Sequence, residues 1–108
     1  MDAYSETAAF EPLRRGETVA VRGHGNSMTP LIKNGETVVL APLPVEASLR
    51  KGDVVLAKVR GRVYLHRVKG LRADTVLIGN NHGGLNGWTA RDQVVGRLAT
   101  SDARGDTP

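Results

Sequence analysis

The sequence contains no cysteine, which excludes disulfide bonds, thiolate metal ligands and a cysteine nucleophile. Aromatic residues are few, with one Phe, one Trp and two Tyr among 108 residues. A surface that binds single-stranded nucleic acid by stacking bases on aromatic rings is therefore not expected. No apolar run approaches the roughly 20 residues that a membrane-spanning helix needs, so we expect no membrane segment in this chain.

A secretory signal is also absent from the start of the sequence, which carries Asp2 and Glu6 and no basic stretch followed by an apolar one. We therefore expect a cytoplasmic protein. The formal charge of +4 comes from basic residues scattered along the chain, which favours a solvated surface over a nucleic-acid partner. The three histidines, His24, His66 and His82, lack metal-ligand spacing, so we expect no metal and no cofactor.

What the sequence does contain is many turn residues, with 13 Gly and 5 Pro between short apolar runs. This pattern favours a single all-β domain over a helical bundle. Alternation predicts strands over 17–23, 36–41, 54–59, 62–71, 74–79 and 93–100, with 54–59 and 62–71 forming a hairpin. We expect residues 1–16 to be a flexible N-terminal arm, 17–100 the folded domain, 80–88 a polar loop and 101–108 a disordered tail.

The stretch GNSMTP at residues 25–30 places Ser27 after small, flexible residues and before a stiffening proline. A serine nucleophile needs an accessible hydroxyl, a base within reach and donors for the oxyanion. His66 lies at the centre of a predicted strand, and a histidine is largely neutral at pH 7, so it can accept a proton. Each residue has a plainer reading, because serines commonly cap short helices and histidines occur in strands without catalysis.

Alternation along the same predicted strand separates its side chains into two faces. One face carries His66, and the opposite face carries its immediate neighbours. The two predicted sets are Tyr64, His66 and Val68, and Val63, Leu65 and Arg67.

Several segments resemble, in order, the conserved boxes of the signal peptidase and LexA-like self-cleaving repressor families. They are GNSMTP at 25–30, the segment 31–40, GDVV at 52–55, YLHRV at 64–68, GNN at 79–81 and DQVVGR at 92–97. The resemblance covers about residues 17–100 and implies a coiled β-barrel of short strands, with at most one short helix or turn after Ser27. It also implies that Ser27 is the nucleophile and that His66 replaces the lysine base of bacterial members, as in archaeal and endoplasmic-reticulum signal peptidases.

The sequence departs from that Ser/His branch in the loop after the predicted strand 74–79. The branch typically has Gly-Asp-Asn and then another acid, whereas residues 79–86 read GNNHGGLN and contain no carboxylate. Asn80 and Asn81 are candidates to orient His66 by hydrogen bonding, and Asp92 is the nearest downstream acid. Backbone groups around Ser27, including those of Asn26 and Met28, are candidates for binding the oxyanion.

The resemblance therefore implies a soluble serine peptidase, either an endopeptidase or a self-processing protein, that acts on an extended peptide with small residues at the cleavage point. The small side chains at positions 7–9, TAA, offer one internal cleavage site. An alternative is a catalytically inactive interaction or dimerisation module, which leaves a homodimer open, and a third is a basic nucleic-acid binder.

Two further residues invite a functional interpretation and also have an ordinary one. Lys58 is an alternative base, but it lies in the first strand of the predicted hairpin, whereas His66 lies in the second. We therefore expect Lys58 to be a solvent-exposed lysine of a strand. Trp88 can line a substrate groove, although a core or rim position is more common for a single tryptophan.

Overall fold

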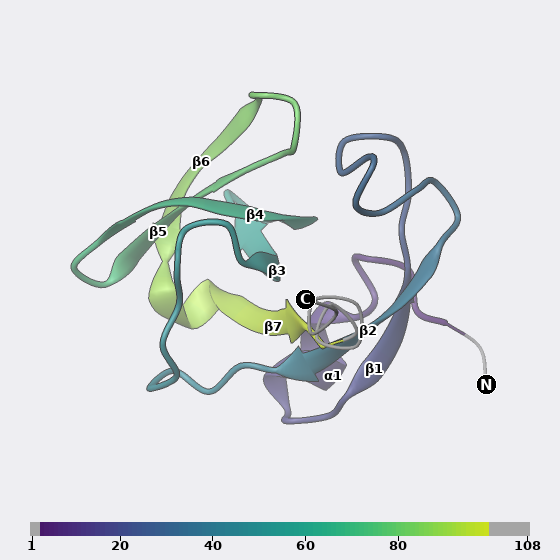
Figure 1. Ribbon diagram of the computed structural model, residues 1–108. Helices are drawn as coiled ribbons and strands as arrows, with labels where there is room; N and C mark the ends of the chain where they lie inside the picture. Colours follow the sequence, from purple (N-terminus) through teal and green to yellow (C-terminus); the bar gives the residue numbers. More distant parts are fainter. Residues whose placement is uncertain (1–2, 100–108) are drawn as a thin grey trace, which may run out of the picture.

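A computed structural model describes residues 3–99 of the chain, and it is mainly β, as expected (Figure 1). One antiparallel sheet of seven strands has the order β1-β2-β7-β3-β4-β5-β6. The strands are β1 (Val19–Arg22), β2 (Thr37–Pro42), β3 (Val54–Val59), β4 (Arg62–Arg72), β5 (Thr75–Gly79), β6 (Leu85–Ala90) and β7 (Val94–Leu98). Within residues 3–99, no helix is long and apolar enough to cross a membrane.

The predicted hairpin is formed by β3 and β4, which join through a two-residue turn. Arg60 and Gly61 both have positive φ angles, of 52° and 81°. Such a turn matches the right-handed twist of the two strands. The register pairs Val59 with Arg62 and Val55 with His66, which places the histidine one pair from the end of the β3/β4 ladder that is farthest from the turn.

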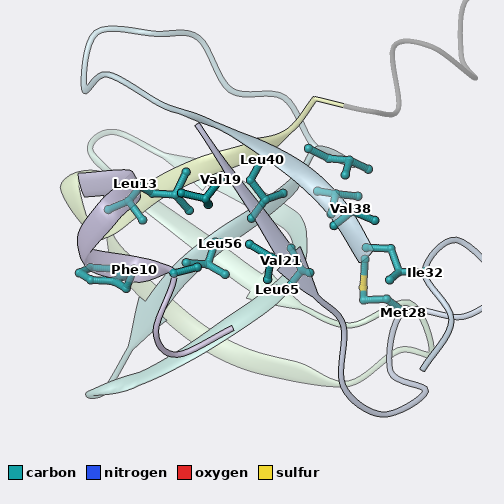
Figure 2. Packing of buried hydrophobic residues seen from close by; sticks show 14 residues of the cluster. Phe10, Leu13, Val19, Val21, Met28, Ile32, Val38, Leu40, Leu56 and Leu65 are labelled. Atoms are coloured by element: carbon teal, nitrogen blue, oxygen red, sulfur yellow. The ribbon is translucent and has the colours of Figure 1, made fainter. Parts of the chain in front are cut away.

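Alternation in β4 divides its side chains between two apolar clusters, as predicted. Leu65 packs in the cluster that includes β1, β2 and the N-terminal helix, several members of which are shown in Figure 2. Val68 and the partly buried Tyr64 pack in a second cluster with residues of β3 and β5. The sheet therefore has apolar side chains on both faces, and β3 contributes to both clusters. Among the described residues 3–99, His66 is the one buried polar or charged side chain.

The prediction of a flexible arm over residues 1–16 is wrong for the segment Phe10–Arg14, which is helical and packed against the core. Residues Phe10–Arg14 form a short helix, α1, and Phe10 and Leu13 are only 4% and 2% exposed. Pro12 is tolerated because it lies in the first turn, where a backbone N–H has no acceptor within the helix. Gly96 of β7 permits the docking, since a Cβ there would lie 2.7 Å from Leu13 Cδ1. A five-residue helix is too short to give a periodic signal.

The prediction of a loop over residues 80–88 is also wrong in its second half, where β6 begins. The β6 strand pairs with β5, and the Thr89 hydroxyl donates a hydrogen bond to the Lys58 carbonyl of β3 (2.7 Å). The strand lies at the edge of the sheet and buries little, so its sequence, LNGWTA, shows no apolar alternation. This strand carries Asn86 toward β4. The predicted tail at residues 101–108 lies outside the described residues.

Candidate active site

Ser27 lies in the loop that follows β1, and this loop is held by several short contacts. The Gly23 N–H donates to the Glu36 carbonyl (2.8 Å), and the Gly23 carbonyl accepts from the Gly35 N–H (3.0 Å). The Gly25 N–H donates to Asn34 Oδ1 (2.9 Å). Gly25 has a φ of 83°, which a residue with a Cβ adopts only under strain. The glycines on either side of His24 therefore suit the tight path of the chain toward Ser27.

The loop brings Ser27 against β4, although 39 residues separate it from His66. The Ser27 hydroxyl and His66 Nε2 are 2.9 Å apart, which is hydrogen-bond distance. His66 is 9% exposed, and its ring stacks on Tyr64 with centroids 5.2 Å apart. Ser27 is half-buried, so its hydroxyl lies at the edge of the core rather than inside it.

The other ring nitrogen of His66 is engaged by β6. His66 Nδ1 lies 2.6 Å from Asn86 Oδ1. An amide oxygen only accepts hydrogen bonds, so Nδ1 is the nitrogen that carries the proton. In a neutral imidazole this leaves Nε2 as the acceptor for the Ser27 O–H. The three side chains form a continuous line from hydroxyl to imidazole to amide.

Asn81, one of the predicted orienting residues, contacts the nucleophile loop instead of the imidazole. Its N–H donates to the Ser27 carbonyl (2.8 Å), and its Nδ2 donates to the Thr29 carbonyl (3.1 Å). Its Oδ1 accepts from Arg67 Nη1 (2.6 Å), and the same guanidinium donates to the Gly52 carbonyl at 3.1 and 3.2 Å. Asn81 therefore fastens the Ser27 turn to the strand that carries His66.

The other predicted orienting residues also lie away from the imidazole. Asn80 Oδ1 accepts from the N–H groups of His82 and Gly84, both at 2.8 Å, and so shapes the loop that leads into β6. Asp92 belongs to the single-turn 3-10 helix before β7 and lines a different hollow with Leu13 of α1. The third amide, Asn86 of β6, is the one that contacts the His66 ring.

The predicted oxyanion neighbours have different surroundings. The Asn26 carbonyl accepts from Thr29, through both its N–H (3.2 Å) and its hydroxyl (2.8 Å), and lies 3.1 Å from His82 Nε2. Met28 is 4% exposed and joins the core. Among residues 3–99, the N–H groups of Ser27 and Met28 have no hydrogen-bond acceptor. Two backbone donors are thus unused beside the Ser27 hydroxyl.

Besides Asn86, Glu6 is a second residue at this site that the sequence did not reveal. Its Oε2 accepts a hydrogen bond from the His24 N–H (3.0 Å), three residues before Ser27. Burial raises the pKa of the Glu6 carboxyl, while hydrogen bonds from the His24 and Leu65 backbones and the nearby His66 oppose part of that rise. Sixty residues of chain separate it from His66, and no local pattern around residue 6 indicates the contact.

Ser27 is one of the residues that line a small cavity of about 10 Å³. Met28, Ile32 and Leu65 contribute apolar side chains to the lining, and Glu6 also lines the cavity. A cavity of this volume has room for about one water molecule, so it admits only very small groups.

The residues proposed as alternatives lie elsewhere. Lys58 places its ammonium 4.3 Å from the centre of the Phe10 ring, a cation–π contact with α1. Trp88 is 39% exposed, and Arg72 lies over its ring at 4.7 Å, at the edge of the sheet. Within the described part of the chain, no group of three or more His, Asp or Glu side chains could hold a metal ion.

A comparison with protein families gives one match, to the Peptidase S24-like model, over residues 3–95. The chain belongs to this family. The match includes α1 and the strands up to the start of β7. A search of curated proteins found no match. Membership of the Peptidase S24-like family establishes a peptidase-like domain, and the chemistry of this particular member rests on its own residues.

Proposed function

We propose that this Peptidase S24-like domain is a serine endopeptidase in which Ser27 is the nucleophile, His66 the general base and Asn86 the residue that orients His66. The observation that supports this proposal most is the 2.9 Å separation of Ser27 Oγ and His66 Nε2, joined to the 2.6 Å contact of Nδ1 with Asn86. Nucleophile, base and orienting group in hydrogen-bonded sequence are the arrangement that activates a serine hydroxyl.

In the proposed reaction, Ser27 Oγ attacks the carbonyl carbon of a peptide while its proton moves to His66 Nε2. The unused N–H groups of Ser27 and Met28 are the candidate donors for the oxyanion of the tetrahedral intermediate. Collapse breaks the C–N bond, and His66 gives its proton to the departing amine. A water molecule then attacks the acyl-enzyme, and His66 takes a proton from that water. The second tetrahedral intermediate collapses, the carboxylic acid leaves, and His66 returns its proton to Ser27 Oγ.

The cavity beside Ser27 bears on which peptides fit. Its lining combines the apolar side chains of Met28, Ile32 and Leu65 with polar groups, and the cavity is far smaller than a leucine or phenylalanine side chain. A substrate with Ala, Gly or Ser at the cleaved position is therefore favoured over one with a bulky residue. The rest of the peptide would lie extended, paired through its main chain with the edge of the sheet.

Cleavage of the chain's own TAA segment is disfavoured compared with cleavage of another peptide. Ala9 is fully buried, and its N–H donates to the Ser5 carbonyl within a turn (3.0 Å). An extended peptide is what the nucleophile requires, and residues 7–9 are neither extended nor free to become so while α1 stays docked.

The inactive interaction module remains the second candidate, and one observation favours it. Asn86 holds the position where a carboxylate would stabilise the imidazolium that forms during attack, and an amide does this less well. This feature predicts a slow enzyme or none. If the domain is an inactive interaction module, a homodimer is one form that the interaction would take.

Labelling with a fluorophosphonate distinguishes the two candidates. The wild-type protein should be modified at Ser27, located by mass spectrometry of the digested protein, and Ser27→Ala should remain unmodified. His66→Ala should lose at least about a hundredfold in labelling rate, the usual contribution of a general base. Thermal unfolding of each variant shows whether the domain is folded. An unmodified, folded wild-type protein at every pH between 6 and 10 would refute the peptidase proposal.

A further inference from the structure

The outer edge of β1 is occupied by the N-terminal segment of the chain. β1 is the first strand in the order of the sheet and has β2 as its neighbour on one side only. On the other side, Tyr4 forms an isolated parallel bridge with Val21. The Tyr4 N–H donates to the Ala20 carbonyl, and the Arg22 N–H donates to the Tyr4 carbonyl, both at 2.9 Å.

The contact continues toward the nucleophile through a side chain. Glu6, two residues after Tyr4, accepts from the His24 N–H at 3.0 Å. Backbone groups of alternate residues point to the same edge of an extended strand. Ala20, Arg22 and His24 therefore present one continuous row of main-chain groups that leads to Ser27, and the N-terminal segment uses each of them.

Glu6 also limits the space at the nucleophile. Glu6 and Ser27 line the same cavity of about 10 Å³, so Glu6 takes up part of the space next to the nucleophile. A peptide that pairs with the edge of β1 and places a carbonyl at Ser27 needs these main-chain groups and this space. The segment and such a peptide cannot occupy the edge together.

We infer that residues 3–6 act as an intramolecular competitor that covers the peptide-binding edge of β1, so that a substrate gains access to Ser27 only by displacing them. The inference rests on the proposed function, because it takes Ser27 as the reacting residue. It assigns to the N-terminal segment a role that its sequence does not indicate.

The contacts of this segment suit displacement. Tyr4 is 38% exposed and is held by two main-chain hydrogen bonds in an isolated bridge. Burial raises the pKa of the Glu6 carboxyl, which means that the ionised form is poorly solvated in its place. By contrast, Ala9 and Phe10 are buried in the core. Residues 3–6 can therefore leave the edge while α1 keeps its position.

The test uses full-length variants that weaken the segment's contacts. Tyr4→Pro removes the N–H that donates to Ala20, and Glu6→Ala removes the acceptor of the His24 N–H and opens the cavity. Glu11→Ala is the matched control, because it removes an exposed carboxylate from α1 that pairs only with Arg14 (3.4 Å). Thermal unfolding shows whether each variant is folded. If Tyr4→Pro does not fold, Glu6→Ala alone provides the test.

Two reagents separate access from reactivity. A compact ethyl fluorophosphonate reports the reactivity of Ser27, and a peptidyl diphenylphosphonate with alanine at the reacting position requires the edge of β1. Each segment variant should raise the peptidyl labelling rate, relative to the compact one, by about fivefold, the effect of one main-chain hydrogen bond. Glu11→Ala should leave this ratio at the wild-type value. An unchanged ratio in both segment variants would overturn the inference.

Peptide binding in the Ser27→Ala background keeps this outcome separate from the proposed function. The affinity for acetyl-Val-Ala-Ala-Ala-amide is measured by calorimetry with and without Tyr4→Pro or Glu6→Ala. About fivefold tighter binding in the segment variants supports the inference even if no reagent labels Ser27. Equal affinities would overturn it, whatever the labelling experiment gives.

Discussion

His66 Nδ1 lies 2.6 Å from Asn86 Oδ1, so the imidazole that faces Ser27 is oriented by an amide and not by a carboxylate. The hydrogen bond fixes the tautomer, with the proton on Nδ1 and the lone pair of Nε2 directed to the Ser27 hydroxyl. It adds no negative charge next to the imidazole. Orientation is thus supplied without the electrostatic stabilisation of an imidazolium.

Replacing Asn86 tests this division directly. Asn86→Asp should accelerate fluorophosphonate labelling of Ser27 by about tenfold or more, because a carboxylate stabilises the imidazolium formed during attack. It should also shift the rising limb of the pH–rate profile to higher pH, since a neighbouring negative charge favours the protonated imidazole, which cannot act as a base. Asn86→Ala should slow labelling by about tenfold. A rate that is the same in all three proteins would contradict the orienting role.

Lys58 should have no part in the chemistry. Its ammonium contacts the Phe10 ring and not Ser27. Lys58→Met should leave the labelling rate of Ser27 unchanged and alter the free energy of unfolding by no more than about 1 kcal/mol, the range of an exposed cation–π contact. Fluorophosphonate labelling of Ser27 and urea denaturation of the Lys58→Met protein measure these two quantities. A large loss of labelling in a folded Lys58→Met protein would instead point to a lysine base.

Asn81→Ala should weaken the joint between the Ser27 turn and β4. The substitution removes the hydrogen bonds to the Thr29 carbonyl and from Arg67, while the backbone bond to Ser27 can persist. The loss of two partly buried hydrogen bonds should lower the free energy of unfolding by about 2 kcal/mol. Urea denaturation measures this. Labelling should fall as well, because Ser27 is held less firmly, and a variant with wild-type values for both would contradict the assignment.

The stability of the domain should depend on pH through Glu6. Burial in the folded protein raises the pKa of this carboxyl above its ordinary value of 4.5, so the folded state binds the proton more tightly than the unfolded state. This contribution to stability is fully present below pH 4.5 and is lost as pH rises through the raised pKa. Glu6→Gln stays neutral and keeps an acceptor for the His24 N–H.

The difference in unfolding free energy between Glu6→Gln and the wild type, measured from pH 4 to pH 8, should therefore rise with pH in favour of the variant. The gain should stay below about 1 kcal/mol, because the side chain is only half-buried and solvent screens its charge. A difference that is flat with pH would show that Glu6 titrates normally. The Glu11→Gln variant, whose carboxylate is exposed, supplies the baseline.

Much of the fold follows from local pattern in the sequence. The alternation around His66 separates Leu65 from Tyr64 onto different clusters, and the Arg60–Gly61 turn is the kind that joins two strands. Local pattern fails where the burial is not local. α1 is buried because β7 offers a glycine at residue 96, and β6 forms by pairing with β5 rather than through its own apolar content.

By itself, the sequence determined the sheet-forming segments other than β6, the family resemblance and the candidate pair Ser27 and His66, because these depend on alternation and on short motifs in order. The tertiary structure alone decided that Asn86 contacts the imidazole and that Glu6 lines the same cavity as Ser27. The physical reason is that both contacts join segments far apart in the chain. Their distances are set by strand register and by the docking of α1, and neither leaves a trace in the residues beside them.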